Sequence, residues 1–421
     1  MHSTGSRVRI RDLLLHGTGA PVDLVIENGL IADVEPAMNP SEGHRRVLLP
    51  GLIDLHTHLR EPGGDDAETI TTGTAAAAAG GFTDVFAMAN TSPVTDDVER
   101  VLDIRRRAAG ALTRVHVVAA GTNGLAGQTP VDVAALAAIG VRLFSDDGKC
   151  VADDDVMVQL LTAIATCDVT FAQHAQDPRI VGEGVINARV ADAAHATPWP
   201  TRGETDIVAR DIAVVRETGA RLHVCHVSTA ETVELIAAAK REGLPVTAEA
   251  TPHHLHFTDN DALARGPALK VNPPFRSPAD VQALRGGLRT GVIDAIGTDH
   301  APHPAAAKQL GWARSAFGLT ALETALPAVA EALTGLNETV DWSRLIDAMH
   351  TRPARIGGLR PQSTPARGEP ATFTVVAQTQ PYAIRPDKQR SRSRNTPFDG
   401  HQFRWSTVLT MIDGRLAYRA E

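Results

Sequence analysis

The chain has 421 residues, of which 43% are hydrophobic, so it can bury a large core. Its formal net charge of -8, with no long basic run, argues against a nucleic-acid-binding surface. The sequence has no apolar run of ~18 residues and no signal-like start, which predicts a protein with no membrane partner. The three cysteines are widely spaced and odd in number, as in proteins with reduced thiols, which predicts a cytoplasmic location.

Both ends of the chain predict short β structure. Residues 8–36 alternate in hydrophobicity and turn at Asn28–Gly29, which is a hairpin signature. The tail from about residue 358 has a similar pattern, with a second hairpin turn at Asp413–Gly414. We therefore expect residues 1–50 and 358–421 to pair into one small β domain beside a main domain of residues 51–357.

The main domain repeats one pattern, in which a short apolar run ends in polar residues and an alanine-rich helical stretch follows. The runs cover residues 51–58, 82–90, 114–121, 141–148, 169–175, 221–228, 245–254 and 292–303. Apolar strands that alternate with helices predict a parallel sheet, and eight of them fit an α/β fold of the (β/α)8 TIM-barrel type. The alternative is an open doubly wound sheet, which would usually carry a Gly-rich phosphate turn that this sequence lacks.

Side chains of metal-binding type end five of these runs. They are His56, His58, Asp146, Asp147, His174, His226 and Asp299. Taken singly, His174 or His226 is more simply a core histidine, and Asp146–Gly148 is more simply a turn. Because the ends of barrel strands meet at one face, the joint pattern favours a divalent metal centre with nitrogen and oxygen ligands. One zinc that keeps a water cannot use so many ligands, so two metals bridged by a carboxylate fit better.

Nine motifs, in order along most of the chain, carry a family resemblance. They are DLHTHLREPG (Asp54–Gly63), AMANTSPVTD (Ala87–Asp96), FSDDGK (Phe144–Lys149), AQHAQD (Ala172–Asp177), CHVSTAET (Cys225–Thr232), TAEATPHHL (Thr247–Leu255), KVNPPFRS (Lys270–Ser277), GTDHAPH (Gly297–His303) and SRNTPF (Ser393–Phe398). Together they resemble the amidohydrolase superfamily and, within it, the class I dihydroorotases.

The resemblance implies two zinc ions per chain. One would be held by His56, His58 and Asp299 and the other by His174 and His226, while the family's spacing favours Asp147 over Asp146 as the bridge. Many relatives bridge with a carboxylated lysine, but here Lys149 lies beyond the strand end, as in class I dihydroorotases. The resemblance further implies that a metal-bridging hydroxide attacks the ring amide and that Asp299 is the general acid and base.

The resemblance also implies a substrate site for a small carboxylated molecule. Arg60 offers a planar fork for a carboxylate and follows His58 into the same mouth. The other residues that resemble substrate contacts are His58, Asn90, Asn272, His303, Phe317 and Gly318.

The implied activity is the reversible cyclisation of N-carbamoyl-L-aspartate to L-dihydroorotate in pyrimidine biosynthesis. Two alternatives stay open: another cyclic amidase, such as a hydantoinase or allantoinase, and a non-catalytic partner of aspartate carbamoyltransferase. Arg60 and Asn90 argue against the first, and the complete ligand set argues against the second. A homodimer and a complex with aspartate carbamoyltransferase are both compatible with the family.

Two segments depart from simple expectation. Residues 304–318 carry alanines where the family usually has acidic side chains, which predicts a change in this loop without loss of a ligand. The basic segment Lys388–Thr396 lacks interleaved aromatic residues, so we interpret it as a solvated loop and not as an anion site.

Overall fold

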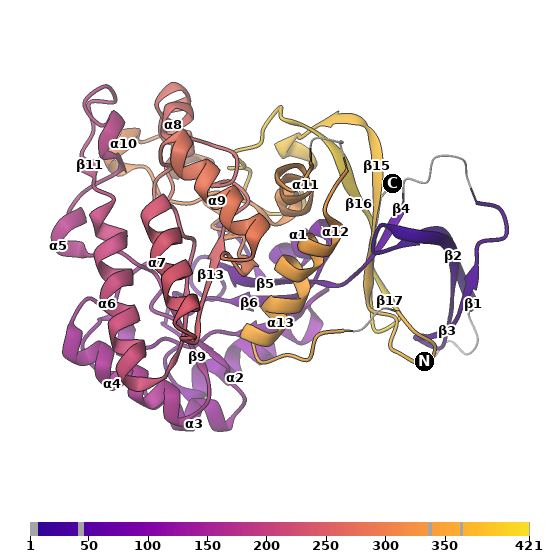
Figure 1. The fold of residues 1–421 in the computed structure, drawn as a ribbon, viewed down its shortest axis with the longest axis horizontal. Coiled ribbons are helices and arrows are strands. Elements are labelled where there is room, and N and C mark those ends of the chain that lie inside the picture. The colour runs from indigo at the N-terminus through magenta and orange to yellow at the C-terminus, as the bar shows by residue number, and fades with distance from the viewer. Residues whose placement is uncertain (1–6, 41–45, 336–338, 363–364, 421) are drawn as a thin grey trace.

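The computed structural model describes residues 7–40, 46–335, 339–362 and 365–420. Parallel strands lie at the centre of the main body with helices around them, and a separate sheet lies at one end, beside both chain termini (Figure 1). Among these residues, no helix combines the length and the apolar character that crossing a bilayer requires.

The two ends of the chain form a single seven-stranded sheet, which confirms the predicted pairing. Its order is β17-β16-β15-β4-β1-β2-β3, and the antiparallel pairing of β4 with β15 joins the two ends. The strands are β1 (Arg7–Leu15), β2 (Thr18–Glu27), β3 (Leu30–Pro36), β4 (Arg46–Pro50), β15 (Phe373–Ala383), β16 (Gln402–Ile412) and β17 (Arg415–Arg419). Buried side chains from both ends, including Leu24, Leu48 and Phe373, make one apolar cluster on this sheet.

Both predicted hairpin turns are present and lie against each other. Asn28 and Gly29 have φ of 52° and 79°, and Asp413 and Gly414 have φ of 50° and 73°, as tight hairpins with two left-handed residues require. A Cβ atom on Gly414 would lie 2.0 Å from the Cα of Gly29, so this contact admits only glycine.

The eight predicted strands of the main body all form, in two parallel sheets. The three-stranded sheet has the order β5-β6-β7 and the five-stranded sheet the order β14-β13-β12-β9-β8. They are β5 (Leu52–Thr57), β6 (Phe82–Ala87), β7 (Arg114–Val117), β8 (Leu143–Phe144), β9 (Thr170–Gln173), β12 (Arg221–Val224), β13 (Val246–Ala250) and β14 (Ala295–Ile296). Isolated parallel bridges join Ala119 to Phe144 and Thr57 to His300, at the edges where the two sheets face each other.

Helices follow the strands and cover their outer faces (Figure 1). The longer ones are α1 (Ile70–Gly80), α2 (Val98–Arg107), α4 (Asp154–Thr166), α6 (Arg202–Thr218), α7 (Ala230–Arg241), α9 (Pro278–Thr290) and α11 (Leu322–Ala332). Shorter elements are α3 (Val133–Ala138), α5 (Pro178–Val181), β10 (Ile186–Asn187), β11 (Pro198–Trp199), α8 (Asp259–Arg265), α10 (Gly311–Arg314), α12 (Trp342–Ile346) and α13 (Arg352–Ile356). Side-chain oxygens of Thr69, Asp97, Asp153, Thr229 and Ser277 cap the N-termini of α1, α2, α4, α7 and α9, so the start of each helix is encoded locally.

Candidate functional site

The ends of five parallel strands bring the predicted ligand residues into one buried cluster, which we call the strand-end cluster. Its members are His56, His58, Asp147, His174, His226 and Asp299, and all six are buried. Asp147 lies at its centre, with Oδ1 3.2 Å from His56 Nε2, 3.1 Å from His174 Nδ1 and 3.4 Å from His226 Nε2. Its Oδ2 is 3.3 Å from His58 Nε2. One carboxylate therefore contacts all four imidazoles.

Asp299 approaches two of these imidazoles. Its Oδ1 lies 3.0 Å from His58 Nε2 and 3.6 Å from His56 Nε2. His226 and Asp299 have φ of 30° and 44°, and Arg60 has φ of 61°. These left-handed conformations are uncommon for residues with side chains, and they occur here where the chain leaves β5, β12 and β14.

The neighbouring aspartates after β8 have different surroundings. Asp146 accepts hydrogen bonds from the backbone N–H groups of Gly121 and Thr122, at 2.8 and 2.9 Å, and from the Thr122 hydroxyl. Its carboxylate is occupied by the loop after β7, so of the two aspartates Asp147 is the one that contacts the imidazoles.

A second layer of buried carboxylates surrounds the cluster, and sequence reasoning missed it. Glu249 on β13 lies between His56 and His223, with His56 Nδ1 at 2.6 Å and His223 Nε2 at 3.1 Å. Asp54 on β5 accepts hydrogen bonds from the hydroxyl groups of Thr57 and Thr298, both at 2.6 Å. The available signal was a carboxylate inside an otherwise apolar strand, which is expensive unless it is paired.

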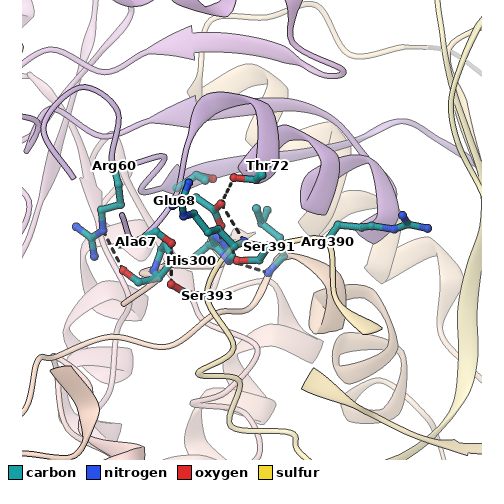
Figure 2. Close-up of polar contacts among 12 residues, drawn as sticks. Arg60, Ala67, Glu68, Thr72, His300, Arg390, Ser391 and Ser393 are labelled. Atoms are coloured by element: carbon teal, nitrogen blue, oxygen red, sulfur yellow. Dashed lines mark hydrogen bonds and ion pairs between the residues drawn. The ribbon is translucent and has the colours of Figure 1, made fainter. Parts of the chain in front are cut away.

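Glu68 is a third buried carboxylate, and it links its own segment to His300 and to Ser391 (Figure 2). It lies 3.2 Å from His300 Nε2 and accepts hydrogen bonds from the hydroxyls of Thr72 and Ser391. The Nδ1 atom of His300 accepts the N–H of Ala321 at 3.1 Å, which assigns the ring proton to Nε2. His300, which follows Asp299 in the chain, is thereby held through both nitrogens of its ring.

This network corrects the interpretation of Lys388–Thr396 as a solvated loop. Ser391 and Ser393 are buried, and the Ser393 hydroxyl donates to Ala67 O at 2.7 Å (Figure 2). Arg392 and Arg394 are exposed. The Asn395 amide donates to Gly318 O at 3.1 Å. Alternation in an extended segment therefore places one face against the site and the other in water.

The carboxylates and imidazoles of the cluster shift one another's pKa. Burial disfavours the charged ring of His56, but Asp147 and Glu249 outweigh it and raise the pKa of His56 well above its ordinary value. Burial raises the pKa of Asp147 and Asp299 in turn, yet the adjacent imidazoles outweigh it and hold both below the ordinary carboxyl value. Both carboxylates are ionised at neutral pH.

The donor set fits a divalent metal. In the neutral form of the His56 ring, the contact with Glu249 assigns the proton to Nδ1, and the Nε2 lone pair then faces the oxygens of Asp147 and Asp299. Nε2 has no hydrogen-bond partner. A cation between these atoms would satisfy all of them. Ligand atoms of His56, His58 and Asp299 lie within 4.8 Å of one another, as do those of His56, Asp147 and His226.

The predicted substrate residues line a cavity of about 210 Å³ above the cluster. They are His58, Arg60, Asn90, Asn272, His303, Phe317 and Gly318. Arg60 Nε donates to Pro302 O at 3.3 Å, and the Nη2 atom lies 3.4 Å from His303. The Asn272 amide donates to Gln176 Oε1 at 2.9 Å, and its own oxygen is buried without a partner. The cavity thus joins the Arg60 cation to one polar atom without a partner, the side-chain oxygen of Asn272.

The alanine-rich loop of residues 304–318 is closed by a lysine and not by acidic residues. Lys308 is buried, and its ammonium group donates to the carbonyls of Lys270, Ala316 and Gly318 at 2.7, 2.9 and 3.0 Å. His303 Nε2 lies 2.6 Å from Phe317 O. These contacts hold Phe317 and Gly318 at the cavity wall, so the departure from the family pattern loses no lining residue.

Comparisons with known proteins agree with this geometry. The family described as Dihydro-orotase-like matches residues 45–232. The chain is 41% identical to the dihydroorotase of Streptomyces coelicolor, covering 97% of this chain and 98% of that protein. It is 40% identical to the dihydroorotase of Mycobacterium tuberculosis, covering 98% of each.

Solved structures share the fold. The L-hydantoinase (dihydropyrimidinase) from Arthrobacter aurescens matches with a TM-score of 0.85 at 25% identity, covering 98% of this chain and 96% of that one. A dihydropyrimidinase from Brevibacillus agri matches with a TM-score of 0.84 at 22% identity. With relatives above 30% identity aligned over nearly its whole length, the chain belongs to the dihydroorotase family.

Proposed function

We propose that this protein is a dihydroorotase, which interconverts N-carbamoyl-L-aspartate and L-dihydroorotate in pyrimidine biosynthesis. The observation that carries the proposal is the cavity that places Arg60 beside the strand-end cluster. It is supported by identity of about 40% to dihydroorotases along the whole chain. The substrate is a small carboxylate, and the cavity offers one guanidinium for it.

The strand-end cluster would hold two zinc ions. His56, His58 and Asp299 would bind one ion, His174 and His226 the other, and Asp147 would contact both. When bound, such ions supply a hydroxide nucleophile at neutral pH and polarise the amide carbonyl. Glu249 orients His56 through Nδ1, which leaves Nε2 free for an ion.

Asp299 is the proposed proton carrier. Its carboxylate is ionised at neutral pH because the adjacent imidazoles outweigh the effect of burial on its pKa, so it is ready to accept a proton. In the hydrolytic direction the nucleophile gives its proton to Asp299 as the C–O bond forms, and Asp299 delivers that proton to the leaving nitrogen as the ring C–N bond breaks. In ring closure Asp299 removes a proton from the carbamoyl nitrogen as the C–N bond forms, and delivers it to the departing oxygen as the C–O bond breaks, so that water is released.

The remaining cavity residues bind and orient the substrate. Arg60 would hold the carboxylate with two parallel hydrogen bonds, and Asn90 and His303 line the same cavity. The unpartnered oxygen of Asn272 can accept an N–H of the ring. Phe317 and Gly318 offer backbone groups at the cavity wall.

A substrate comparison tests the activity directly. Dihydroorotate, hydantoin and allantoin would be assayed with the same zinc-loaded preparation, and metal content would be measured by mass spectrometry. We expect turnover of dihydroorotate, with close to two zinc ions per chain, and loss of turnover on chelation. Turnover confined to hydantoin or allantoin would refute the proposal, as would a metal-free protein with full activity.

A hydantoinase is the second candidate, because the two solved structures quoted above are a hydantoinase and a dihydropyrimidinase. The cluster disfavours a hydantoinase, because the carboxylate that lies among the imidazoles belongs to Asp147 and not to a modified lysine. Lys149 lies two residues further along the chain and is not among the residues that line the cavity. A non-catalytic partner of aspartate carbamoyltransferase is disfavoured because all six ligand residues are present and converge.

We also infer that the two parallel sheets close into one (β/α)8 barrel of residues 51–357, with residues 1–50 and 358–421 as the small β domain. The bridges Ala119–Phe144 and Thr57–His300 support this closure. A separate apolar cluster that combines Leu55, Phe86 and Ala172 from three strands supports a common interior. The cytoplasmic location, the homodimer and the complex with aspartate carbamoyltransferase stay predictions.

A further inference from the structure

A second group of imidazole and carboxylate side chains lies outside the strand-end cluster. The turn after β13 contributes His256, helix α11 contributes Glu331, and the residue before β16 is His401. One ligand atom from each of the three lies within 4.8 Å of the other two. These residues come from three separate parts of the chain, so only folding brings their donors together.

The ring of His256 is preset for a ligand at Nδ1. Its Nε2 lies 2.9 Å from the carbonyl oxygen of Ala328, so Nε2 carries the proton and Nδ1 carries a lone pair. Nδ1 faces Glu331 Oε1 at 3.7 Å, a distance too long for a hydrogen bond. Both atoms carry lone pairs, so each is an acceptor without a donor between them. Metal-binding histidines commonly donate their second N–H to a backbone carbonyl in this way.

His401 is held in a similar way by its surroundings. Its Nε2 lies 3.3 Å from Glu331 Oε2, and its ring centroid is 4.5 Å from Phe403 and 5.7 Å from Phe398. The backbone N–H of His401 donates to Phe398 O at 2.9 Å. Because both phenylalanines are buried, the imidazole is oriented by packing as well as by the carboxylate.

We propose that His256 Nδ1, Glu331 and His401 Nε2 form a further divalent-cation site, with zinc as the preferred ion. Two imidazoles and one carboxylate are a zinc-type ligand set, whereas magnesium and calcium prefer oxygen ligands throughout. The Glu331 side chain is 46% exposed and lines a cavity of about 400 Å³ with Thr334 and Gln402, which leaves room for water as the fourth ligand.

An ion at this site would join the turn after β13, helix α11 and the segment before β16. The segment before β16 also carries Ser391, which donates to Glu68, and Asn395, which donates to Gly318 O at the cavity wall. A ligand that binds only the folded state stabilises it in proportion to its free concentration. We therefore expect zinc bound at this site to raise the Tm of the enzyme, in addition to the rise caused by zinc bound at the strand-end cluster.

Zinc itself is the probe for the test. Crystals of the holoenzyme soaked in zinc would be measured at the zinc absorption edge, and zinc per chain would be counted in buffered solution. We expect an anomalous peak between the three side chains. Glu331→Gln and His401→Asn should each bind about one zinc fewer per chain, show a smaller zinc-dependent rise in Tm than the unaltered enzyme, and keep its turnover.

Two matched variants serve as controls, because Glu234 on α7 and His195 are exposed and lie outside both clusters. Glu234→Gln and His195→Asn should bind zinc like the unaltered enzyme. The proposal is overturned if no peak lies at the site, or if Glu331→Gln and His401→Asn keep the full zinc content. Melting without added zinc checks that each variant is folded, so a lost ion is not mistaken for a lost fold.

Discussion

The strand-end cluster and the terminal seven-stranded sheet are both built on β structure, but they hold their side chains by different means. At the strand ends, ionised groups are buried, and each is oriented by another buried polar group, as His56 is by Glu249. In the terminal sheet, apolar side chains and tight turns such as Asp413–Gly414 suffice. We therefore expect substitutions in the strand-end cluster to reduce turnover most, and substitutions in the terminal sheet to reduce mainly the free energy of unfolding.

The largest effect on turnover is expected at Asp299. Asp299→Asn keeps the size and the left-handed backbone conformation but cannot carry a proton. We expect kcat to fall by about 10²–10⁴-fold, with little change in Tm, measured by steady-state kinetics with dihydroorotate. Asp192→Asn, at an exposed position, is the control and should retain full activity. Undiminished kcat in Asp299→Asn would contradict the assigned role.

The next largest effect is expected at Arg60, which has φ of 61° and lines the cavity. Arg60→Lys keeps the charge but loses the planar fork, so KM should rise by about 10–100-fold, as expected for the loss of charge-assisted hydrogen bonds. The measurement is KM for dihydroorotate with kcat determined in parallel. The exposed Arg106→Lys should leave both constants unchanged, and an unaltered KM in Arg60→Lys would exclude a carboxylate contact.

A smaller effect is expected from the second layer, at Glu68. Glu68→Gln replaces an acceptor of several hydrogen bonds by a group that also donates, which should loosen His300 and the Ser391 segment. Such a change is worth about 1–3 kcal/mol, and we expect kcat to fall by about tenfold while KM changes less. The neighbouring exposed Asp66→Asn controls for the lost charge. A pure loss of Tm with normal kcat would show that Glu68 only stabilises the fold.

The smallest effect on turnover is expected in the terminal sheet. Gly414→Ala would place a Cβ atom 2.0 Å from Gly29 Cα, so the two hairpin turns must separate. We expect a loss of about 1–3 kcal/mol in the free energy of unfolding, with kcat unchanged, measured by denaturant titration and kinetics. Gly19→Ala has a similar positive φ with no atom within 4 Å of the added Cβ, and should lose less. Equal losses in both variants would assign the effect to backbone strain alone.

Much of the fold could be predicted from local patterns. Each of the two hairpin turns needs only a pair of residues that adopt the left-handed conformation. The eight strands are indicated by short apolar runs that precede helical stretches. The loop of residues 388–396 was predicted wrongly, because composition cannot show that Ser391 and Ser393 face a buried partner such as Glu68.

The sequence by itself determined which residues end the strands, and therefore that His56, His58 and Asp299 meet at one face. The family's spacing favoured Asp147 over Asp146, and only the tertiary structure gave the physical reason, because the loop after β7 takes up the carboxylate of Asp146 while Asp147 contacts the imidazoles. Strand ends follow from periodicity, which near neighbours encode. The partner of a buried carboxylate depends on segments hundreds of residues away, as for Glu68 and Ser391, and only packing brings them together.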